Sequence, residues 1–154
     1  MIVVQYPEPQ FRMKNENGKQ YIFDSIRKVW LLLTEEEWVR QNFVNYLVNK
    51  LKYPSTVIAL EKEICLNDLK KRFDILVYNN DHKPWMLVEC KEPYVNLNDE
   101  VLQQVLRYNI SVPVEYIVIT NGKATVGWRR EGQLRLLKQM PDWGSTHFNS
   151  HGQK

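Results

Sequence analysis

The chain has 154 residues, which is enough for one ordinary domain with its own core and too short to predict two. Apolar residues make up 44% of the sequence and charged residues 25%, which is typical of a soluble globular protein and not of a disordered chain. The formal net charge of +3 permits a nucleic-acid partner but does not by itself predict one.

Neither the N-terminal segment nor the apolar runs of the sequence indicate a membrane or an oxidising compartment. The N-terminal stretch MIVVQYPEPQ lacks the basic and long apolar regions of a signal peptide. The apolar run VWLLL is far shorter than the roughly 20 residues that span a bilayer. We therefore expect a cytoplasmic protein without a membrane partner, in which Cys65 and Cys90 are reduced, small core residues.

The first third of the chain predicts a hairpin followed by a helix. Residues 10–24 alternate around the turn NENG, which indicates a β-hairpin. A helix is expected to start at Thr34, because Thr34 and Glu37 have the spacing of a capping box in which the Glu37 side chain reaches back to Thr34. Apolar residues then recur at helical spacing to about Leu51.

The remaining elements alternate between strands and one further helix. Strands are expected over TVIAL (56–60), RFDILVY (72–78), PWMLVECKE (84–92) and VEYIVIT (114–120), with NNDHK as the turn between the second and third. Residues 97–110 predict a helix that Asn98 or Asn96 caps. Residues 123–130 and 133–138 predict a closing hairpin. This order indicates an α/β or α+β domain over residues 1–140, with a mixed sheet flanked by helices. A polar tail over 141–154 follows, expected to be weakly ordered or to pack only through Trp143.

The stretch WMLVECKEP interrupts an otherwise apolar strand with two charged residues. Side chains alternate faces along a strand, so Glu89 and Lys91 share one face. A turn centred near Asp81 or His82 places Asp74 opposite Glu89, on that same face. Two carboxylates this close repel each other, and a bound divalent cation removes the conflict. Mg²⁺ prefers carboxylate oxygens and retained waters, so Asp74 and Glu89 are candidate ligands.

Each helix offers further polar residues to this cluster. At 100° per residue, Glu36 lies within about 20° of Phe43 at the middle of the apolar stripe, so its carboxylate needs a partner in the interior. Gln104 and Tyr108 share one face of the second helix, roughly opposite the apolar residues of that helix.

Structural explanations compete with every member of the cluster. Asp74 and Lys91 could form a surface ion pair, which contributes roughly 0–1 kcal/mol. Glu36 could be a favourable charge in a first helical turn, and Gln104 and Tyr108 an ordinary solvated face. No histidine site is expected, since His82 lies in a turn and His147 and His151 lie in the tail. No phosphate loop or G-x-G-x-x-G motif is present, so neither ATP nor a dinucleotide is expected as a cofactor.

These residues resemble the PD-(D/E)xK nuclease superfamily. The resemblance rests on FD at 73–74, ECK at 89–91 and QVLRY at 104–108, the last as a Q-x-x-x-Y element. The blocks EEWVRQNFVNYL, KRFDILVY, PWMLVECKEP, QQVLRYN and VITNG are similar, in this order, to the N-terminal nuclease domain of the R subunit of type I restriction enzymes. The resemblance covers roughly residues 30 to 125.

The resemblance implies a restriction-endonuclease-like fold, with the site at one sheet edge, and a Mg²⁺-dependent DNA endonuclease for which Mn²⁺ could substitute. Asp74 and Glu89 would be metal ligands and Lys91 the catalytic lysine. Glu36 would be the acid of the first helix, and Gln104 and Tyr108 the accessory pair. The R subunit's ATP-driven motor has no counterpart here, so motor or specificity subunits would be separate partners.

Several basic residues are candidates for contacts to DNA phosphates without sequence reading. They are Lys70, Lys71, Arg72, Arg129 and Arg130. Two alternatives remain open at this point. The chain could be a non-catalytic module that keeps the nuclease fold and binds nucleic acid or a protein. It could also be a purely structural domain with a surface ion pair.

Overall fold

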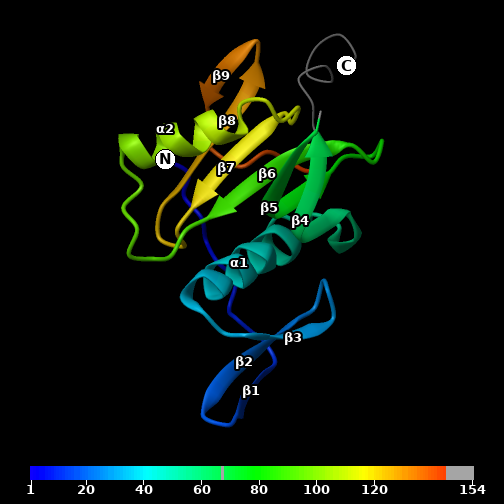
Figure 1. Ribbon diagram of the computed structural model, residues 1–154, viewed down its shortest axis with the longest axis vertical. Coiled ribbons are helices and arrows are strands. Elements are labelled where there is room, and N and C mark those ends of the chain that lie inside the picture. Colours follow the sequence, from blue (N-terminus) through cyan, green and yellow to red (C-terminus); the bar gives the residue numbers. More distant parts are fainter. Residues whose placement is uncertain (67, 145–154) are drawn as a thin grey trace.

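The computed structural model describes residues 1–66 and 68–144 and contains two β-sheets and two main helices (Figure 1). The first sheet consists of β1 (Met13–Glu16), β2 (Lys19–Asp24) and β3 (Val29–Leu32), in that order. The second consists, also in chain order, of β4 (Ile58–Leu66), β5 (Leu69–Tyr78), β6 (Pro84–Cys90), β7 (Tyr116–Thr120), β8 (Thr125–Glu131) and β9 (Gln133–Leu136). Strands β6 and β7 pair in parallel, and the other neighbours are antiparallel. The predicted α+β domain with a mixed sheet is therefore confirmed.

The N-terminal sheet begins as predicted and then gains a strand that was not predicted. Asn17 and Gly18 both have positive φ, 52° and 77°, as a tight hairpin turn between β1 and β2 requires. The run VWLL, expected to lead directly into the helix, instead forms β3 against β2. A run of four apolar residues carries little periodicity, and the unpaired edge of β2 decides its conformation.

The first helix starts where the sequence predicts. The α-helix α1 spans Glu35–Asn45, and the Oγ1 atom of its N-cap Thr34 accepts a hydrogen bond from the Glu37 backbone N–H at 3.0 Å. One turn of π-helix, η1 (Tyr46–Lys50), continues it almost to the expected end, and a short 3₁₀ turn, η2 (Ser55–Val57), precedes β4. The second helix, α2, spans Asp99–Asn109, and of the two predicted caps Asn98 is the one that acts, accepting from Val101 N–H.

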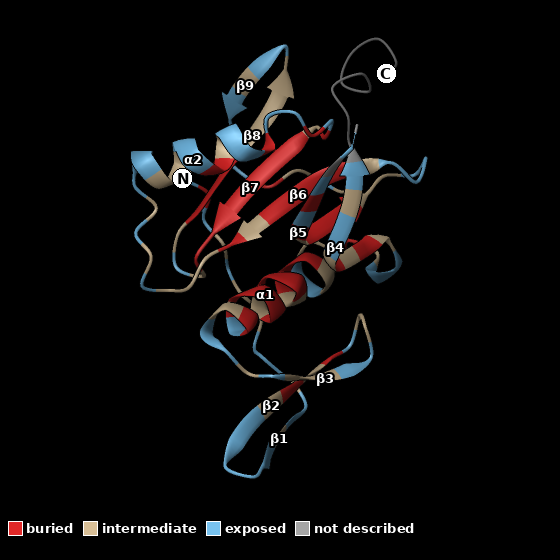
Figure 2. Cartoon of the chain, in the orientation of Figure 1, coloured by how far each residue is buried: buried red, intermediate tan, exposed pale blue. Residues whose placement is uncertain are grey.

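The two helices cover opposite faces of the six-stranded sheet. Val39 and Phe43 of α1 belong to one buried cluster with the strand residues Ile75 and Val88. Leu106 of α2 packs against a second cluster that includes Leu76, Leu87 and Ile117. Strand β7 is buried along its whole length between them (Figure 2). The near-continuous apolar run of this strand is what a strand covered on both faces requires.

The alternation of faces breaks once, at the position where β4 and β5 pass Asp74. Ile75 and Val77 of β5 lie in the cluster beneath α1, but Phe73 lies in the cluster beneath α2. On β4, Glu61 stands in the register position opposite Asp74 and has a left-handed backbone, with φ of 48°. A non-glycine residue in this region is strained, and such positions concentrate at functional sites. The regular alternation of side chains along β5 is therefore interrupted at Asp74.

Both cysteines were expected to be core residues, and one of them is. Cys90 is buried, as predicted, but Cys65 is exposed, because it lies near the end of the edge strand β4. Within the part of the chain that the structure describes, no helix is long and apolar enough to cross a membrane.

The chain after β9 packs through more than Trp143. Trp143 Nε1 donates to the Tyr78 carbonyl at 2.9 Å, and Tyr53 Oη donates to the Pro141 carbonyl at 2.6 Å. Met140 is also buried. The rest of the predicted tail, 145–154 with His147 and His151, lies outside the described residues.

Candidate functional site

The pairing of β5 and β6 places the two predicted ligands on neighbouring strands. Ile75 pairs with Val88 and Leu76 with Leu87, the register that the turn predicts; extended by one residue it brings Asp74 across from Glu89, and the charge of Asp74 acts on the Glu89 carboxyl. The Lys91 ammonium lies 3.8 Å from a Glu89 carboxylate oxygen, which confirms that these two side chains share a face. The candidate site therefore lies on β5 and β6, the second and third strands of the six-stranded sheet.

Both oxygens of the Asp74 carboxylate accept hydrogen bonds from the protein. Oδ1 accepts from Arg40 Nη2 of α1 at 3.1 Å, and Oδ2 accepts from the backbone N–H of Cys90 at 2.7 Å. The second bond fixes the end of β6, directly after Glu89, against the middle of β5. The carboxylate is thus oriented by two different elements, and each of its oxygens keeps a second lone pair for another partner.

Glu89 is held in an environment that disfavours its charge. Burial, followed by the negative charge of Asp74, raises the pKa of Glu89 to about 7, although the Lys91 ammonium opposes the shift. Burial and the Asp74 charge also raise the pKa of Glu36. A carboxyl group with a pKa near neutrality beside further acids is characteristic of functional sites and of sites that take up a cation.

Of the two glutamates Glu36 and Glu37, the second does not make the contact that the capping box predicts. Glu36 shares the Arg40 guanidinium with Asp74, since Arg40 Nη2 donates to Glu36 at 3.2 Å and to Asp74 at 3.1 Å, but its side chain is 40% exposed and not interior as predicted. The Glu37 carboxylate, in contrast, does not fold back onto Thr34: it accepts from Arg40 Nη1 and from Gln41 Nε2. Arg40 and Gln41 follow Glu37 by three and four residues and therefore lie on the same face of the helix. The buried Arg40 guanidinium needs the negative charge of Glu37, whereas the cap at Thr34 is exposed.

Arg40 is the member of the site that the sequence prediction missed. Its side chain is only 3% exposed, and its guanidinium also lies 3.3 Å from a Glu61 oxygen. Arg40 therefore contacts carboxylates of α1, β4 and β5 together. The sequence contains a signal for one part of this arrangement, the i to i+4 spacing from Glu36, but that spacing is equally typical of a solvent-exposed helix pair.

Glu61 extends the ionic network to the N-terminal sheet. Arg27, in the β2–β3 loop, contacts Glu61 at 3.1 Å and Glu37 at 3.6 Å, and its backbone and guanidinium both bond to the buried Asp24. Burial acts to raise the pKa of Glu61, but Arg40 and Arg27 outweigh it and the pKa is lowered. A continuous series of charged contacts thus runs from the N-terminal sheet through Glu61 and Arg40 to Asp74.

The predicted accessory pair on α2 lies apart from this network. Gln104 and Tyr108 are both exposed, and no hydrogen bond in the described part of the chain joins either to Asp74, Glu89 or Lys91. The Tyr108 carbonyl instead accepts from Lys71 of β5, whose ammonium stands 4.4 Å from the Tyr108 ring centroid. Their role as an accessory pair stays a prediction.

Four of the five predicted phosphate-binding cations already have partners within the chain. Lys71 is buried against Tyr108, Arg129 contacts Glu115 at 3.3 Å and Glu131 at 3.1 Å, and Arg130 donates to carbonyls after α2, among them Val112. The Arg72 guanidinium lies 3.4 Å from a Glu61 oxygen but is exposed on β5, and Lys70 is exposed on the same strand. The structure therefore leaves these two as the accessible candidates of the five.

The donors around Asp74 fit a hard divalent cation. No group of three or more histidine, cysteine, aspartate or glutamate side chains within residues 1–66 and 68–144 is arranged to hold a metal ion. Mg²⁺, however, is commonly held by only one or two carboxylates and keeps several waters. Asp74 and Glu89 provide such a pair of oxygen ligands, and the raised pKa of Glu89 is the electrostatic conflict that a cation relieves.

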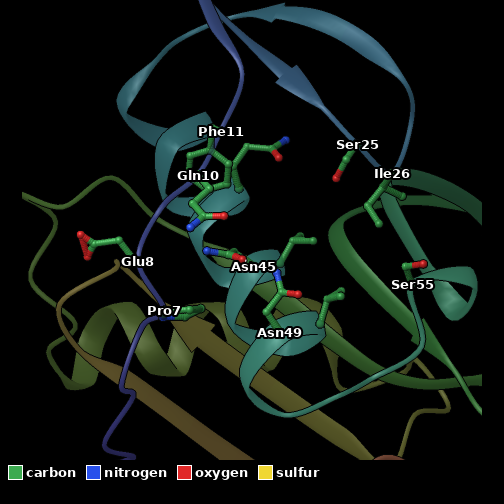
Figure 3. Close-up of a pocket in the computed structure, with 12 residues that line it drawn as sticks. Pro7, Glu8, Gln10, Phe11, Ser25, Ile26, Asn45, Asn49 and Ser55 are labelled. Carbon is green, nitrogen blue, oxygen red and sulfur yellow. Dashed lines mark hydrogen bonds between the residues drawn. The ribbon is translucent and has the colours of Figure 1, made fainter.

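A pocket away from Asp74 and Glu89 has a different character. It has a volume of about 600 Å³ between the N-terminal segment, the β2–β3 loop and the end of α1, and Gln10, Asn45 and Asn49 lie around it (Figure 3). Among its lining residues only Glu8 is charged, and none is a predicted site residue. This lining offers no cation to a phosphate group.

Comparisons with known proteins give a family and similar solved structures. Residues 35–141 match the family model described as the N terminus of the type I restriction enzyme R protein (HSDR_N). No curated protein matches the sequence. Among solved structures, a candidate nuclease of the DUF820 family from Anabaena variabilis aligns over 86% of this chain and 79% of its own, with 11% identity and a TM-score of 0.46.

Proposed function

This chain belongs to the family of type I restriction enzyme R protein N termini, and from this membership and the acidic cluster on β5 and β6 we propose that it is a metal-dependent DNA endonuclease. The observation that carries the proposal is the proximity of the Asp74 and Glu89 carboxyls on neighbouring strands, beside Lys91, where burial and the charge of Asp74 raise the pKa of Glu89 to about 7. A structural domain with a surface ion pair gives no reason for this repulsion between two partly buried carboxylates.

Asp74 and Glu89 would hold a divalent cation, Mg²⁺ or Mn²⁺, at the ends of their side chains. When bound, such a cation supplies Lewis-acid charge at a phosphate group and lowers the pKa of a water molecule. The backbone N–H of Cys90 and the Arg40 guanidinium hold the Asp74 carboxylate in a single orientation for this role. Glu89 would bind the cation in its deprotonated form, so binding would strengthen as the pH rises through about 7.

Lys91 would act on the substrate. Its ammonium is about one-third exposed and 3.8 Å from Glu89, close enough to reach a phosphate or an attacking water at the same site. A positioned cation that offsets charge developing on the phosphate in the transition state is a large catalytic contribution. Glu36, whose side chain is 40% exposed, would help to hold or deprotonate that water, which its raised pKa favours.

One observation favours a second function, a non-catalytic DNA-binding module. Arg40 already donates to Asp74 and neutralises charge there, so the cluster has a built-in counter-ion. In this alternative the site is a structural ion network and cleavage is absent, while DNA binding survives replacement of both Asp74 and Glu89.

A plasmid-nicking assay separates the two functions. Supercoiled plasmid is incubated with the protein in Mg²⁺, in Mn²⁺ and in EDTA, and the variants Asp74→Asn and Lys91→Ala are compared with Glu63→Gln, which removes an exposed carboxylate from β4. The endonuclease predicts metal-dependent nicking that Glu63→Gln retains and the other two lose. Equal nicking by all four proteins, or none by the wild type in either metal, would contradict it.

A further inference from the structure

The outward face of the N-terminal sheet combines aromatic rings with cations. Ile22 and Asp24 are completely buried on the inner side of β2, so the alternate residues Tyr21 and Phe23 point the other way. The register places Lys14 beside Tyr21 and Trp30 beside Phe23 on this outer face. The sheet stands on the far side of α1 from the six-stranded sheet (Figure 1).

We name the outer residues Arg12, Lys14, Tyr21, Phe23 and Trp30 the aromatic–basic platform. The Arg12 guanidinium carbon is 4.6 Å from the Phe23 ring centroid and 5.4 Å from that of Trp30. The Lys14 ammonium is 4.5 Å from the Trp30 ring and 5.9 Å from the Tyr21 ring. Phe23 and Trp30 contact each other edge to face, with centroids 5.3 Å apart. The rings thus hold two flexible cations at fixed places above the sheet, which lowers the entropy lost when they bind an anion.

The sheet also carries an excess of positive charge. Residues 12–32 contain five basic and two acidic residues, and the rest of the chain contains equal numbers of each. One of the two acids, Asp24, is buried and bonded to Arg27. The other, Glu16, lies at the hairpin tip, 3.9 Å from Lys14 and exposed, so its attraction for Lys14 is weak. Residues 12–32 therefore account for the whole formal net charge of +3.

We propose that the aromatic–basic platform binds an unpaired DNA strand. Cations that follow a phosphate backbone, interleaved with rings on which bases stack, are the recognised chemistry of single-strand binding, whereas the bases of an intact duplex offer no open face to a ring. Arg12 and Lys14 turn to the phosphates, and Tyr21, Phe23 and Trp30 receive the bases that the cations uncover. That the strand is DNA rests on the proposed endonuclease function, and the inference deepens it by naming a substrate with an unpaired segment.

The platform is also connected to the candidate site. Asp24 is the last residue of β2, one position after Phe23, and it bonds to Arg27. Arg27 contacts Glu61, and Glu61 contacts Arg40, which donates to Asp74. A strand bound on the platform is therefore held by a sheet that a series of ion pairs connects to Asp74.

The test measures binding in EDTA, so that it does not depend on cleavage. A fluorescein-labelled single-stranded DNA oligonucleotide and its duplex are titrated with the wild type, with the double variant Arg12→Ala/Lys14→Ala and with the control Lys83→Ala/Lys138→Ala, which removes two exposed cations elsewhere. We expect the single strand to bind more tightly than the duplex. We expect the platform variant to weaken it by about tenfold or more, and the control to change it by less than about twofold.

A second readout detects stacking itself. Binding of the unlabelled single strand should quench tryptophan emission, and Trp30→Phe, which keeps a ring in the sheet, should bind with nearly unchanged affinity but lose most of the quenching. Tighter binding of the duplex, equal weakening by the two double variants, or quenching that Trp30→Phe retains would each overturn the inference. Intact single-strand binding without any metal-dependent cleavage would leave the platform standing and refute only the endonuclease.

Discussion

Replacing Glu89 with Gln should make the protein more stable at alkaline pH. The pKa of Glu89 is about 7 in the folded protein against an ordinary value of 4.5, so between these values the folded state binds more protons than the unfolded state. Stability contributed by the protonated group is therefore full below about pH 4.5 and is lost as the pH rises through 7. At about 1.4 kcal/mol for each unit of pKa, the charged form costs roughly 3 kcal/mol at most.

Glu89→Gln keeps the size and hydrogen-bonding capacity of the protonated form and cannot ionise. We expect the variant to match the wild type within about 1 kcal/mol at pH 5 and to exceed its free energy of unfolding by up to roughly 3 kcal/mol at pH 8.5. Urea unfolding at both pH values measures this difference, and Glu63→Gln serves as the matched control with a smaller change. Added Mg²⁺ should stabilise the wild type at pH 8.5 and leave Glu89→Gln unchanged, because a ligand stabilises only the state that binds it. The same difference between variant and wild type at both pH values would refute the buried repulsion on which the site is built.

Three further substitutions test the remaining parts of the site. Arg40→Met should lower the free energy of unfolding by about 3–5 kcal/mol in a urea titration, since it leaves several carboxylates without their buried counter-charge; a loss below about 1 kcal/mol would contradict this. Lys91→Ala should lower the nicking rate by roughly 10²–10³ with a change in stability of about 1 kcal/mol or less, and intact nicking would remove Lys91 from the mechanism. Glu37→Gln should destabilise the fold by about 2–3 kcal/mol in thermal or urea unfolding, because its carboxylate is buried against Arg40. Glu36→Gln should chiefly reduce nicking, and equal effects of both variants on stability would contradict these separate roles.

The features that depend on short-range chemistry could be predicted from the sequence. Thr34 was identified as a cap, and Asn98 as one of two candidates, because a cap side chain bonds to a backbone N–H only a few residues away. The position of Asp74 opposite Glu89 followed from the length of one turn and the two-residue period of a strand. The same period placed Lys91 with Glu89.

The features that depend on several distant elements could not be predicted. Arg40 looked like one more polar residue of a helix, and only the approach of β4 and β5 gives it Glu61 and Asp74 as partners. Once Arg40 is buried, it takes the Glu37 carboxylate that the capping pattern had assigned to Thr34. Local propensity contains no information about such a competition, because burial decides it.

Strand β3 and Tyr108 show the same limit in different ways. The run over Val29–Leu32 is too short for its periodicity to distinguish a strand from a segment that leads into a helix. Pairing with β2 makes it a strand. The helical spacing of Gln104 and Tyr108 correctly put them on one exposed face, but spacing alone did not show that Lys71 would be the cation beside Tyr108. The roles assigned to these residues came from the family resemblance and not from their pattern.

Counting bound Mn²⁺ tests the metal site most directly. Free Mn²⁺ is followed by electron paramagnetic resonance while the wild type, Glu89→Gln and the control Glu63→Gln are titrated with the ion at pH 8, where Glu89 is mostly deprotonated. Asp74 and Glu89 sharing a cation predicts one ion per wild-type chain, the same for Glu63→Gln, and binding weakened by at least about tenfold in Glu89→Gln. Equal binding by all three proteins, or none by the wild type, would contradict a metal site between Asp74 and Glu89.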